Sequence, residues 1–212
     1  MTWEPAPATG GFAIIEQQQK FRLVTRSDMD GLVCAVLLRE LDLIDDILFV
    51  HPKDMQDGKI AITQRDVCTN LPYVENAHLV FDHHLSETLR NEKGLANHII
   101  DAEAPSAARV IYKYYGAHER FGAFFDPMMD AVDKADAAQF TMEDVLEPQG
   151  WELLSFLMDA RTGLGRFREF RIANYALMMD LIVFNPPQVL MTTPPTTPPT
   201  PSAVLSSARA DS

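Results

Sequence analysis

Short apolar runs alternate with longer segments of helical periodicity over most of this chain. The runs with the length and composition of β-strands are 21–25, 47–50, 59–63, 79–81 and 98–100. The segments with a helical pattern of apolar residues are 31–41, 107–115, 124–140, 151–161 and 167–184. Strands that alternate with helices are typical of a parallel sheet. The pattern therefore predicts an α/β fold: a mainly parallel β-sheet with helices on both faces, followed by a helical segment.

The two ends of the chain lack this pattern. Residues 1–19 carry scattered prolines and glycines and predict an irregular N-terminal arm. In 185–212 the prolines gather in Thr-Thr-Pro-Pro repeats. Such a composition cannot build a core, so we expect a disordered Pro/Thr-rich tail there. One folded domain is expected between these ends, at 20–184.

Composition narrows the range of partners. The chain has 212 residues, is 47% hydrophobic and carries a formal net charge of −12. An acidic surface repels phosphate backbones, so we expect no stable binding to duplex nucleic acid. No apolar run reaches the roughly 18–20 residues of a membrane span, and the first residues lack the pattern of a signal peptide. We therefore expect no membrane association and a cytoplasmic location.

Polar side chains with metal-binding capacity follow several of the predicted strands. Asp28 and Asp30 come after the first strand, Asp66 after the third, and the tripeptide Asp-His-His at 82–84 after the fourth. The carboxyl ends of parallel strands meet at one edge of a sheet, where α/β proteins bind ligands. Clustered carboxylates repel one another, and a divalent cation removes that cost. The pattern therefore predicts a metal site at this edge.

The residue types indicate which ion and which chemistry. Carboxylates with an imidazole favour Mn²⁺, with Mg²⁺ or Co²⁺ as substitutes. Gly31 allows a sharp turn into the first helix, whose free N–H groups favour an anion such as phosphate. Two ions about 3.5–4 Å apart with a shared carboxylate would activate water for in-line attack on phosphorus. Asp66 is the candidate for that bridge, and the number of ions, one or two, stays open.

Four motifs in this order resemble those of the DHH family of phosphoesterases. That family includes RecJ-type nucleases, nanoRNA and cyclic-dinucleotide phosphodiesterases, exopolyphosphatases and family II inorganic pyrophosphatases. Its Asp-x-Asp-Gly motif matches 28–31, its lone aspartate matches Asp66, and its name-giving triplet matches 82–84. Its fourth motif, an aspartate in a segment like Asp-Thr-Gly-x-Phe, aligns with 136–140, and Asp133 is the rival aspartate.

The resemblance covers residues from about 21 to about 140 and implies a role for each motif residue. The implied metal ligands are Asp28, Asp30, Asp66, His83 and Asp136. His84 would face the substrate phosphate or donate a proton, and Asp82 would orient the imidazoles. The implied activity is hydrolysis of a phosphoester or phosphoanhydride bond in a small substrate, such as polyphosphate, a nucleotide or a short oligonucleotide.

Two departures from the family pattern favour an alternative. Family members often carry a metal-binding histidine just before the first aspartate pair, where this chain has Arg26. They also usually carry a C-terminal substrate-binding domain, where this chain continues into the Pro/Thr tail. The alternative is therefore a catalytically weak or inactive phosphate-binding or scaffold protein. Arg26, Arg161 and Arg166 are the candidates for contacts with a substrate phosphate.

A third interpretation is a phosphatase of the haloacid dehalogenase type, with Asp28 as the nucleophile. It explains the Asp-x-Asp pair but leaves the triplet at 82–84 without a role. We therefore set it aside.

Overall fold

The computed structural model describes residues 20–90, 94–159, 161–164, 166 and 174–183. The irregular arm predicted for 1–19 and the tail predicted for 185–212 lie outside these residues. No helix among the described residues is long and apolar enough to cross a membrane.

A five-stranded sheet forms the centre of the fold, with the strand order β2-β1-β3-β4-β5. The strands are β1 (Phe21–Arg26), β2 (Ile44–Val50), β3 (Asp66–Thr69), β4 (Leu79–Asp82) and β5 (His98–Ile100). Every pair of neighbours is parallel. All five carboxyl ends therefore lie at one edge, with the end of β3 between those of β1 and β4. The predicted α/β fold with a mainly parallel sheet is confirmed.

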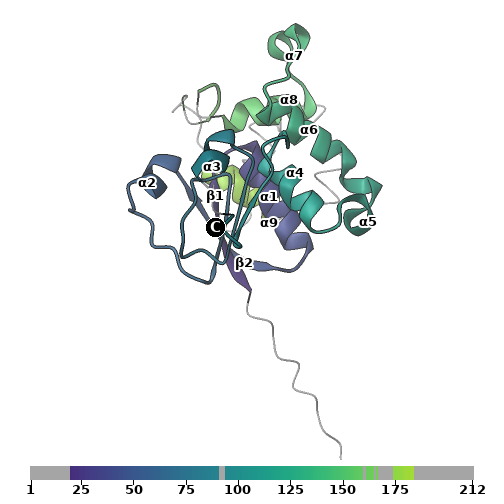
Figure 1. Ribbon diagram of the computed structural model, residues 1–212. Helices are drawn as coiled ribbons and strands as arrows, with labels where there is room; N and C mark the ends of the chain where they lie inside the picture. The colour runs from purple at the N-terminus through teal and green to yellow at the C-terminus, as the bar shows by residue number, and fades with distance from the viewer. Residues whose placement is uncertain (1–19, 91–93, 160, 165, 167–173, 184–212) are drawn as a thin grey trace, which may run out of the picture.

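Helices and connecting segments cover the two faces of the sheet. The helices are α1 (Met29–Glu40), α2 (Pro52–Gln56), α3 (Leu85–Arg90), α4 (Ala107–Tyr114), α5 (Ala117–Phe121), α6 (Asp126–Asp136), α7 (Met142–Leu146), α8 (Gly150–Met158) and α9 (Asn174–Val183), with a short 3₁₀ turn η1 (Ala123–Phe125) before α6. Figure 1 shows α1, α4 and α9 on one side of the sheet and α2 on the other. The side chains of α1 pack with those of α4, α6 and α8 in the larger core cluster.

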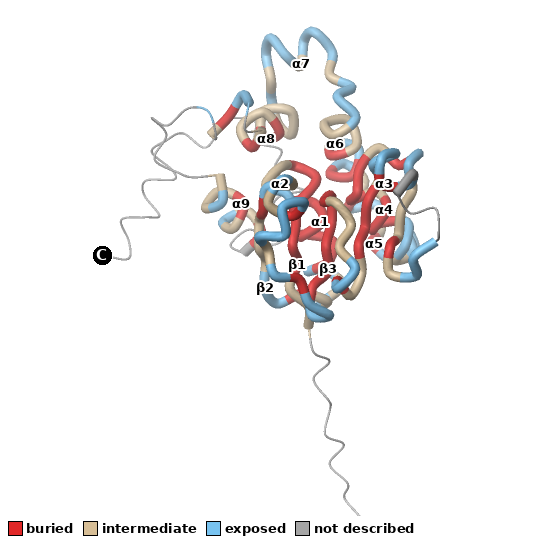
Figure 2. The backbone as a smooth tube through the Cα atoms, turned by 60° about the vertical axis from the view of Figure 1, so that its left-hand side comes forward, coloured by how far each residue is buried: buried red, intermediate tan, exposed pale blue. Residues whose placement is uncertain are grey.

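Helix α1 is buried along nearly its whole length. Its residues from Met29 to Leu38 are all buried, and in Figure 2 it lies with β1 and β3 in the most buried part of the molecule. Almost every position from Leu32 to Leu38 is apolar, which is typical of a helix surrounded by other elements. A smaller cluster with Val24, Met55 and Leu71 covers the opposite face of the sheet. The strand end that carries Asp28 is thus held in place by the core on both faces.

The position of β3 differs from the prediction. The strand was expected at 59–63, but those residues are irregular and β3 begins at Asp66. Ile62 is buried against the smaller cluster rather than in the sheet. Because β3 lies between β1 and β4, all of its residues are buried, including the polar ones at its two ends. Asp66 therefore begins a strand instead of following one.

Candidate metal centre

The turn between β1 and α1 places the first aspartate pair at the carboxyl edge of the sheet. Asp28 is the N-cap of α1, and its Oδ1 accepts a hydrogen bond from the Gly31 N–H at 3.0 Å. Its Oδ2 lies 2.9 Å from Arg26 Nε. A Cβ atom at position 31 would lie 1.9 Å from the carbonyl oxygen of Arg26, so only glycine fits this turn. Burial raises the pKa of Asp28, although Gly31 and Arg26 oppose the shift.

Asp30 is bound by the N-terminus of α4. Its side chain is 1% exposed, and its two oxygens accept hydrogen bonds from the N–H groups of Ala107 at 3.0 Å and Ala108 at 2.8 Å. Free N–H groups at a helix start stabilise a carboxylate. Even so, burial and the charges of Asp136 and Asp28 raise the pKa of Asp30 to about 8. Crowded carboxylates of this kind are relieved by a cation.

His83 faces Asp136 across the same space. His83 Nε2 lies 2.9 Å from Asp136 Oδ2, and its Nδ1 lies 3.2 Å from the carbonyl oxygen of Ala104. A carbonyl only accepts, so we assign the proton to Nδ1, which leaves a lone pair on Nε2 in the neutral ring. Burial alone would lower the pKa of His83, but its contact with Asp136 and the charge of Asp30 raise it to about 9.

These three side chains could hold a metal ion. The ligand atoms of Asp30, His83 and Asp136 all lie within 4.8 Å of one another. Two carboxylates and one imidazole are a donor set that suits Mn²⁺ and related ions. The tautomer fixed by Ala104 presents the free nitrogen of His83 to this space, as metal-binding histidines require.

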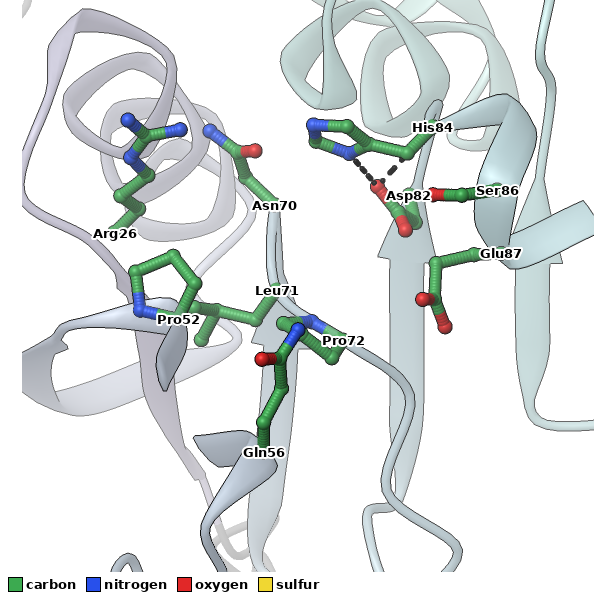
Figure 3. A pocket seen from close by; sticks show the side chains of 10 residues that line it. All are labelled: Arg26, Pro52, Gln56, Asn70, Leu71, Pro72, Asp82, His84, Ser86 and Glu87. Carbon is green, nitrogen blue, oxygen red and sulfur yellow. Dashed lines mark hydrogen bonds and ion pairs between the residues drawn. The ribbon is translucent and has the colours of Figure 1, made fainter. Parts of the chain in front are cut away.

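Asp82 and His84 form a second pair at the end of β4. Asp82 is completely buried, and its Oδ1 accepts from the backbone N–H of His83 at 2.8 Å and from that of His84 at 3.3 Å. The same oxygen lies 2.6 Å from His84 Nδ1, as Figure 3 shows. This hydrogen bond raises the pKa of His84. Asp82 Oδ2 is buried and has no hydrogen-bond partner among the described residues.

Of the two rival aspartates on α6, the structure brings Asp136 to His83. Asp133 instead accepts hydrogen bonds from Ser106 Oγ at 2.7 Å and from Arg109 Nε at 2.6 Å. Ser106 also caps α4, so Asp133 ties α4 to α6 rather than facing the ion site. Whether Asp136 binds a metal remains a prediction.

Asp66 does not lie with the other candidates, and its expected role as a bridge between two ions is wrong. It pairs with Arg22 near the start of β1, whereas Asp28 follows the end of that strand. Four residues of strand separate the two edges, roughly 13 Å at about 3.3 Å per residue. Its carboxylate is also fully engaged, with Arg22 Nε at 2.6 Å and the Thr63 N–H at 2.6 Å.

Asn70 takes the place at the site that was expected for Asp66. It follows the end of β3, between the ends of β1 and β4, and is 2% exposed. Its Nδ2 lies 3.4 Å from Asp28 Oδ1, and its Oδ1 finds no partner in the part of the chain that the structure describes. The sequence carried a signal for this residue, because Pro72 two positions later marks the end of a strand.

A pocket of about 200 Å³ adjoins Asp82 and His84 (Figure 3). Its walls are Arg26, Pro52, Gln56, Asn70, Leu71, Pro72, Asp82, His84, Ser86 and Glu87. Of the three arginines proposed for phosphate contacts, only Arg26 lines it. Arg161 pairs with Asp159, with Nη2 and Oδ2 2.6 Å apart, and Arg166 Nη1 donates to the backbone oxygen of Arg161 at 3.2 Å.

The fold and the site together define an α/β domain whose carboxylates and imidazoles converge at the carboxyl edge of a parallel sheet. A solved structure, described as the pGpG-specific phosphodiesterase PggH from Vibrio cholerae, is similar to this chain, with 58% sequence identity and a TM-score of 0.70. The match covers 82% of this chain and 57% of that one, so this chain spans little more than half of that protein. No family model matches the chain, and neither does any curated protein.

Proposed function

We propose that this chain is a metal-dependent phosphodiesterase domain of the DHH type that hydrolyses a short linear dinucleotide. The observation that carries the proposal is the convergence of Asp30, His83 and Asp136 beside the half-exposed His84. The likeness to a protein described as pGpG-specific supports the substrate class. The motif pattern supports the DHH family, with Asn70 at the strand end where a lone acidic residue was expected.

Asp30, His83 and Asp136 are the proposed ligands of the divalent ion. Mn²⁺ is favoured because the donors are carboxylates with one imidazole, and Mg²⁺ or Co²⁺ would substitute. When bound, such an ion would polarise the phosphate and lower the pKa of water. The N-terminus of α4 holds Asp30 at a fixed position, and Ala104 holds the ring of His83. The ligand atoms of Asp30 and His83 are therefore prepositioned by backbone groups.

His84 and Arg26 are the proposed contacts with the substrate phosphate. Asp82 orients the ring of His84 through Nδ1 and keeps it protonated at higher pH than a free histidine. Its other ring nitrogen is then free to donate a hydrogen bond or a proton to a phosphate oxygen. Arg26 lines the same pocket as His84. A guanidinium is a good partner for phosphate because its donors lie in a fixed plane.

The test is turnover by the purified chain on a panel of substrates with Mn²⁺. We expect pGpG and water to give two molecules of GMP, faster than polyphosphate, pyrophosphate or a longer RNA is degraded. His83→Ala and Asp136→Asn should abolish turnover. Asp133→Asn is the matched control, because the same change three residues away leaves the ligand atoms in place.

Two outcomes contradict the proposal. If the chain binds Mn²⁺ and pGpG but turns over none of the substrates, the alternative of a phosphate-binding or scaffold protein is correct. Equal turnover in the presence of a chelator would show that the acidic cluster is not a metal centre.

A further inference from the structure

The two halves of the site differ in the charge of their side chains. The half formed by the start of α1, the end of β4 and the end of α6 contains Asp30, His83 and Asp136, whose ligand atoms lie within 4.8 Å of one another. The half formed by the ends of β1 and β3 contains Asp28 with Arg26 and Asn70 (Figure 3 shows the last two). A second ion, if present, would have to bind in this second half.

Asp28 already has donors on both oxygens. Oδ1 accepts from the Gly31 N–H at 3.0 Å and lies 3.4 Å from Asn70 Nδ2. Oδ2 lies 2.9 Å from Arg26 Nε. A carboxylate that is neutralised by a guanidinium and accepts further N–H groups offers little to a dication, and the guanidinium itself repels one.

Asn70 adds no charge at the position between Asp28 and Asp82. It is buried at the end of the central strand, where both flanking strands bring an aspartate. Its unpartnered Oδ1 can coordinate an ion or accept a hydrogen bond, but a neutral amide oxygen does not offset the charge of a second dication. A carboxylate at the same position would do so.

Only part of the Arg26 side chain is used within the domain. Its Nε pairs with Asp28, and its charge also acts on Asp159, but no hydrogen bond or ion pair joins its Nη groups to another described residue. The half-exposed side chain lines the pocket beside His84. Figure 3 shows the guanidinium of Arg26 and the ring of His84 on opposite sides of Asn70. An arginine held through Nε keeps two donor groups for a phosphate oxygen.

We propose that this centre holds a single divalent ion, at Asp30, His83 and Asp136, and that Arg26 replaces a second ion as the positive charge that binds the substrate phosphate. The inference rests on the proposed metal centre and deepens it. Asn70 and Arg26 act together here. Asn70 adds no negative charge to the subsite where a second ion would bind, and Arg26 fills that subsite with a fixed positive charge.

The ratio of bound Mn²⁺ to protein tests the first half of this inference, and it does not depend on turnover. Isothermal titration of the purified chain should give one ion per chain. The double variant Arg26→His with Asn70→Asp should bind a second ion, at least about tenfold more tightly than any second binding by the wild type. The matched control is Arg65→His with Asn76→Asp, which makes the same change of charge at exposed positions and should still bind one.

Phosphate binding tests the second half. Arg26→Gln should bind one Mn²⁺ as the wild type does, but its Mn²⁺-loaded form should bind inorganic phosphate about tenfold more weakly. Arg26→Lys should recover part of that loss, because it restores the charge without the planar donors.

The outcomes separate this inference from the proposed function. Two ions of similar affinity in the wild type overturn it, even if pGpG is hydrolysed. One ion in the double variant, with circular dichroism showing a native fold, also overturns it, as does phosphate binding that is unchanged in Arg26→Gln. If the wild type binds no Mn²⁺, the proposed metal centre itself is wrong. One ion without turnover leaves the inference standing and removes only the proposed activity.

Discussion

The substitution Asp66→Asn is expected to destabilise the fold by about 2–3 kcal/mol and to leave Mn²⁺ binding unchanged. The carboxylate is 1% exposed. It accepts hydrogen bonds from Arg22 Nε at 2.6 Å and from the Thr63 N–H at 2.6 Å and Oγ1 at 3.0 Å. An asparagine of the same shape must turn its amide group toward one of these donors, which then loses its acceptor. Losing a hydrogen bond between charged groups costs about 1.5–3 kcal/mol.

The pH dependence of this effect follows from the pKa of Asp66. Burial alone would raise that pKa, but the hydrogen bonds from Arg22 and Thr63 outweigh burial and hold the pKa below its ordinary value of 3.8. A carboxylate with a lowered folded-state pKa stabilises the fold above its unfolded-state pKa and loses this effect as the pH falls through the folded-state value. The difference between wild type and Asp66→Asn should therefore be constant from pH 7 to about 5 and shrink below about pH 4.

Urea unfolding followed by circular dichroism measures the change in stability, and isothermal titration with Mn²⁺ measures the change in binding. The expected loss is small against the roughly 5–15 kcal/mol of a typical domain, so the variant should remain folded at 25 °C. Asp136→Asn should give the opposite result, with binding lost and stability nearly kept. If Asp66→Asn loses Mn²⁺ binding while its unfolding free energy is unchanged, the placement of Asp66 at the far edge of the sheet is refuted.

Three further outcomes are expected. Asp133→Asn should lower the unfolding free energy by about 1–3 kcal/mol because Arg109 loses its ion pair with Asp133. Asp136→Asn should instead weaken Mn²⁺ binding by at least about tenfold. Equal effects of the two variants on Mn²⁺ binding in titrations would contradict the assignment of Asp136 as a ligand. Gly31→Ala should cost about 1–3 kcal/mol in urea unfolding because the new Cβ meets the carbonyl oxygen of residue 26, and a neutral result would show that the turn adapts. Mn²⁺ at a hundred times its Kd should stabilise the wild type by about 2.7 kcal/mol, seen as a rise in melting temperature, and no rise should occur with His83→Ala.

The sequence predicted the elements that have sharp boundaries. The strand at 21–25 and the helix that follows Gly31 are found as β1 and α1. The polar turn with Asp28 and Asp30 separates the apolar residues of the strand from those of the helix, so the boundary is clear in the sequence. The triplet at 82–84 was correctly placed at a strand end for the same reason: β4 ends at Asp82. These two connections bring Asp28, Asp30 and His83 to one edge of the sheet.

The strand β3 could not be recognised from its own residues. Ile60 and Ile62 alternate with other residues as in a half-buried strand, whereas β3 itself is Asp-Val-Cys-Thr. Its polar ends are buried because β1 supplies their partners: Arg22 binds Asp66, and Thr25 Oγ1 lies 2.7 Å from Thr69 Oγ1. Pairing between strands distant in the sequence thus decides which residues form the strand. The error moved Asp66 to the wrong edge and concealed Asn70.

The choice between Asp133 and Asp136 also depended on a distant element. The two lie three apart on α6 and so share one face of the helix. Their spacing in the sequence therefore does not show which of them faces His83. Arg109 on α4 settles the geometry, because it pairs with Asp133 and leaves the position near His83 to Asp136. An arginine 24 residues away in the chain cannot be assigned that partner by spacing alone.

The division of the site into two halves follows from the order of strands in the sheet rather than from the order of motifs in the chain. Because β3 lies between β1 and β4, the side chain after β3 contacts Asp28 and lines the pocket with Asp82. The neutral Asn70 and the cationic Arg26 therefore lie in the same half of the site, where both contact Asp28, although the two positions are far apart in sequence. Neither of them touches Asp30, His83 or Asp136, which are held by α4, the 104 carbonyl and α6. The chain can therefore exchange one cation for an arginine without disturbing the ligands of the other, which is what the proposed single-ion centre requires.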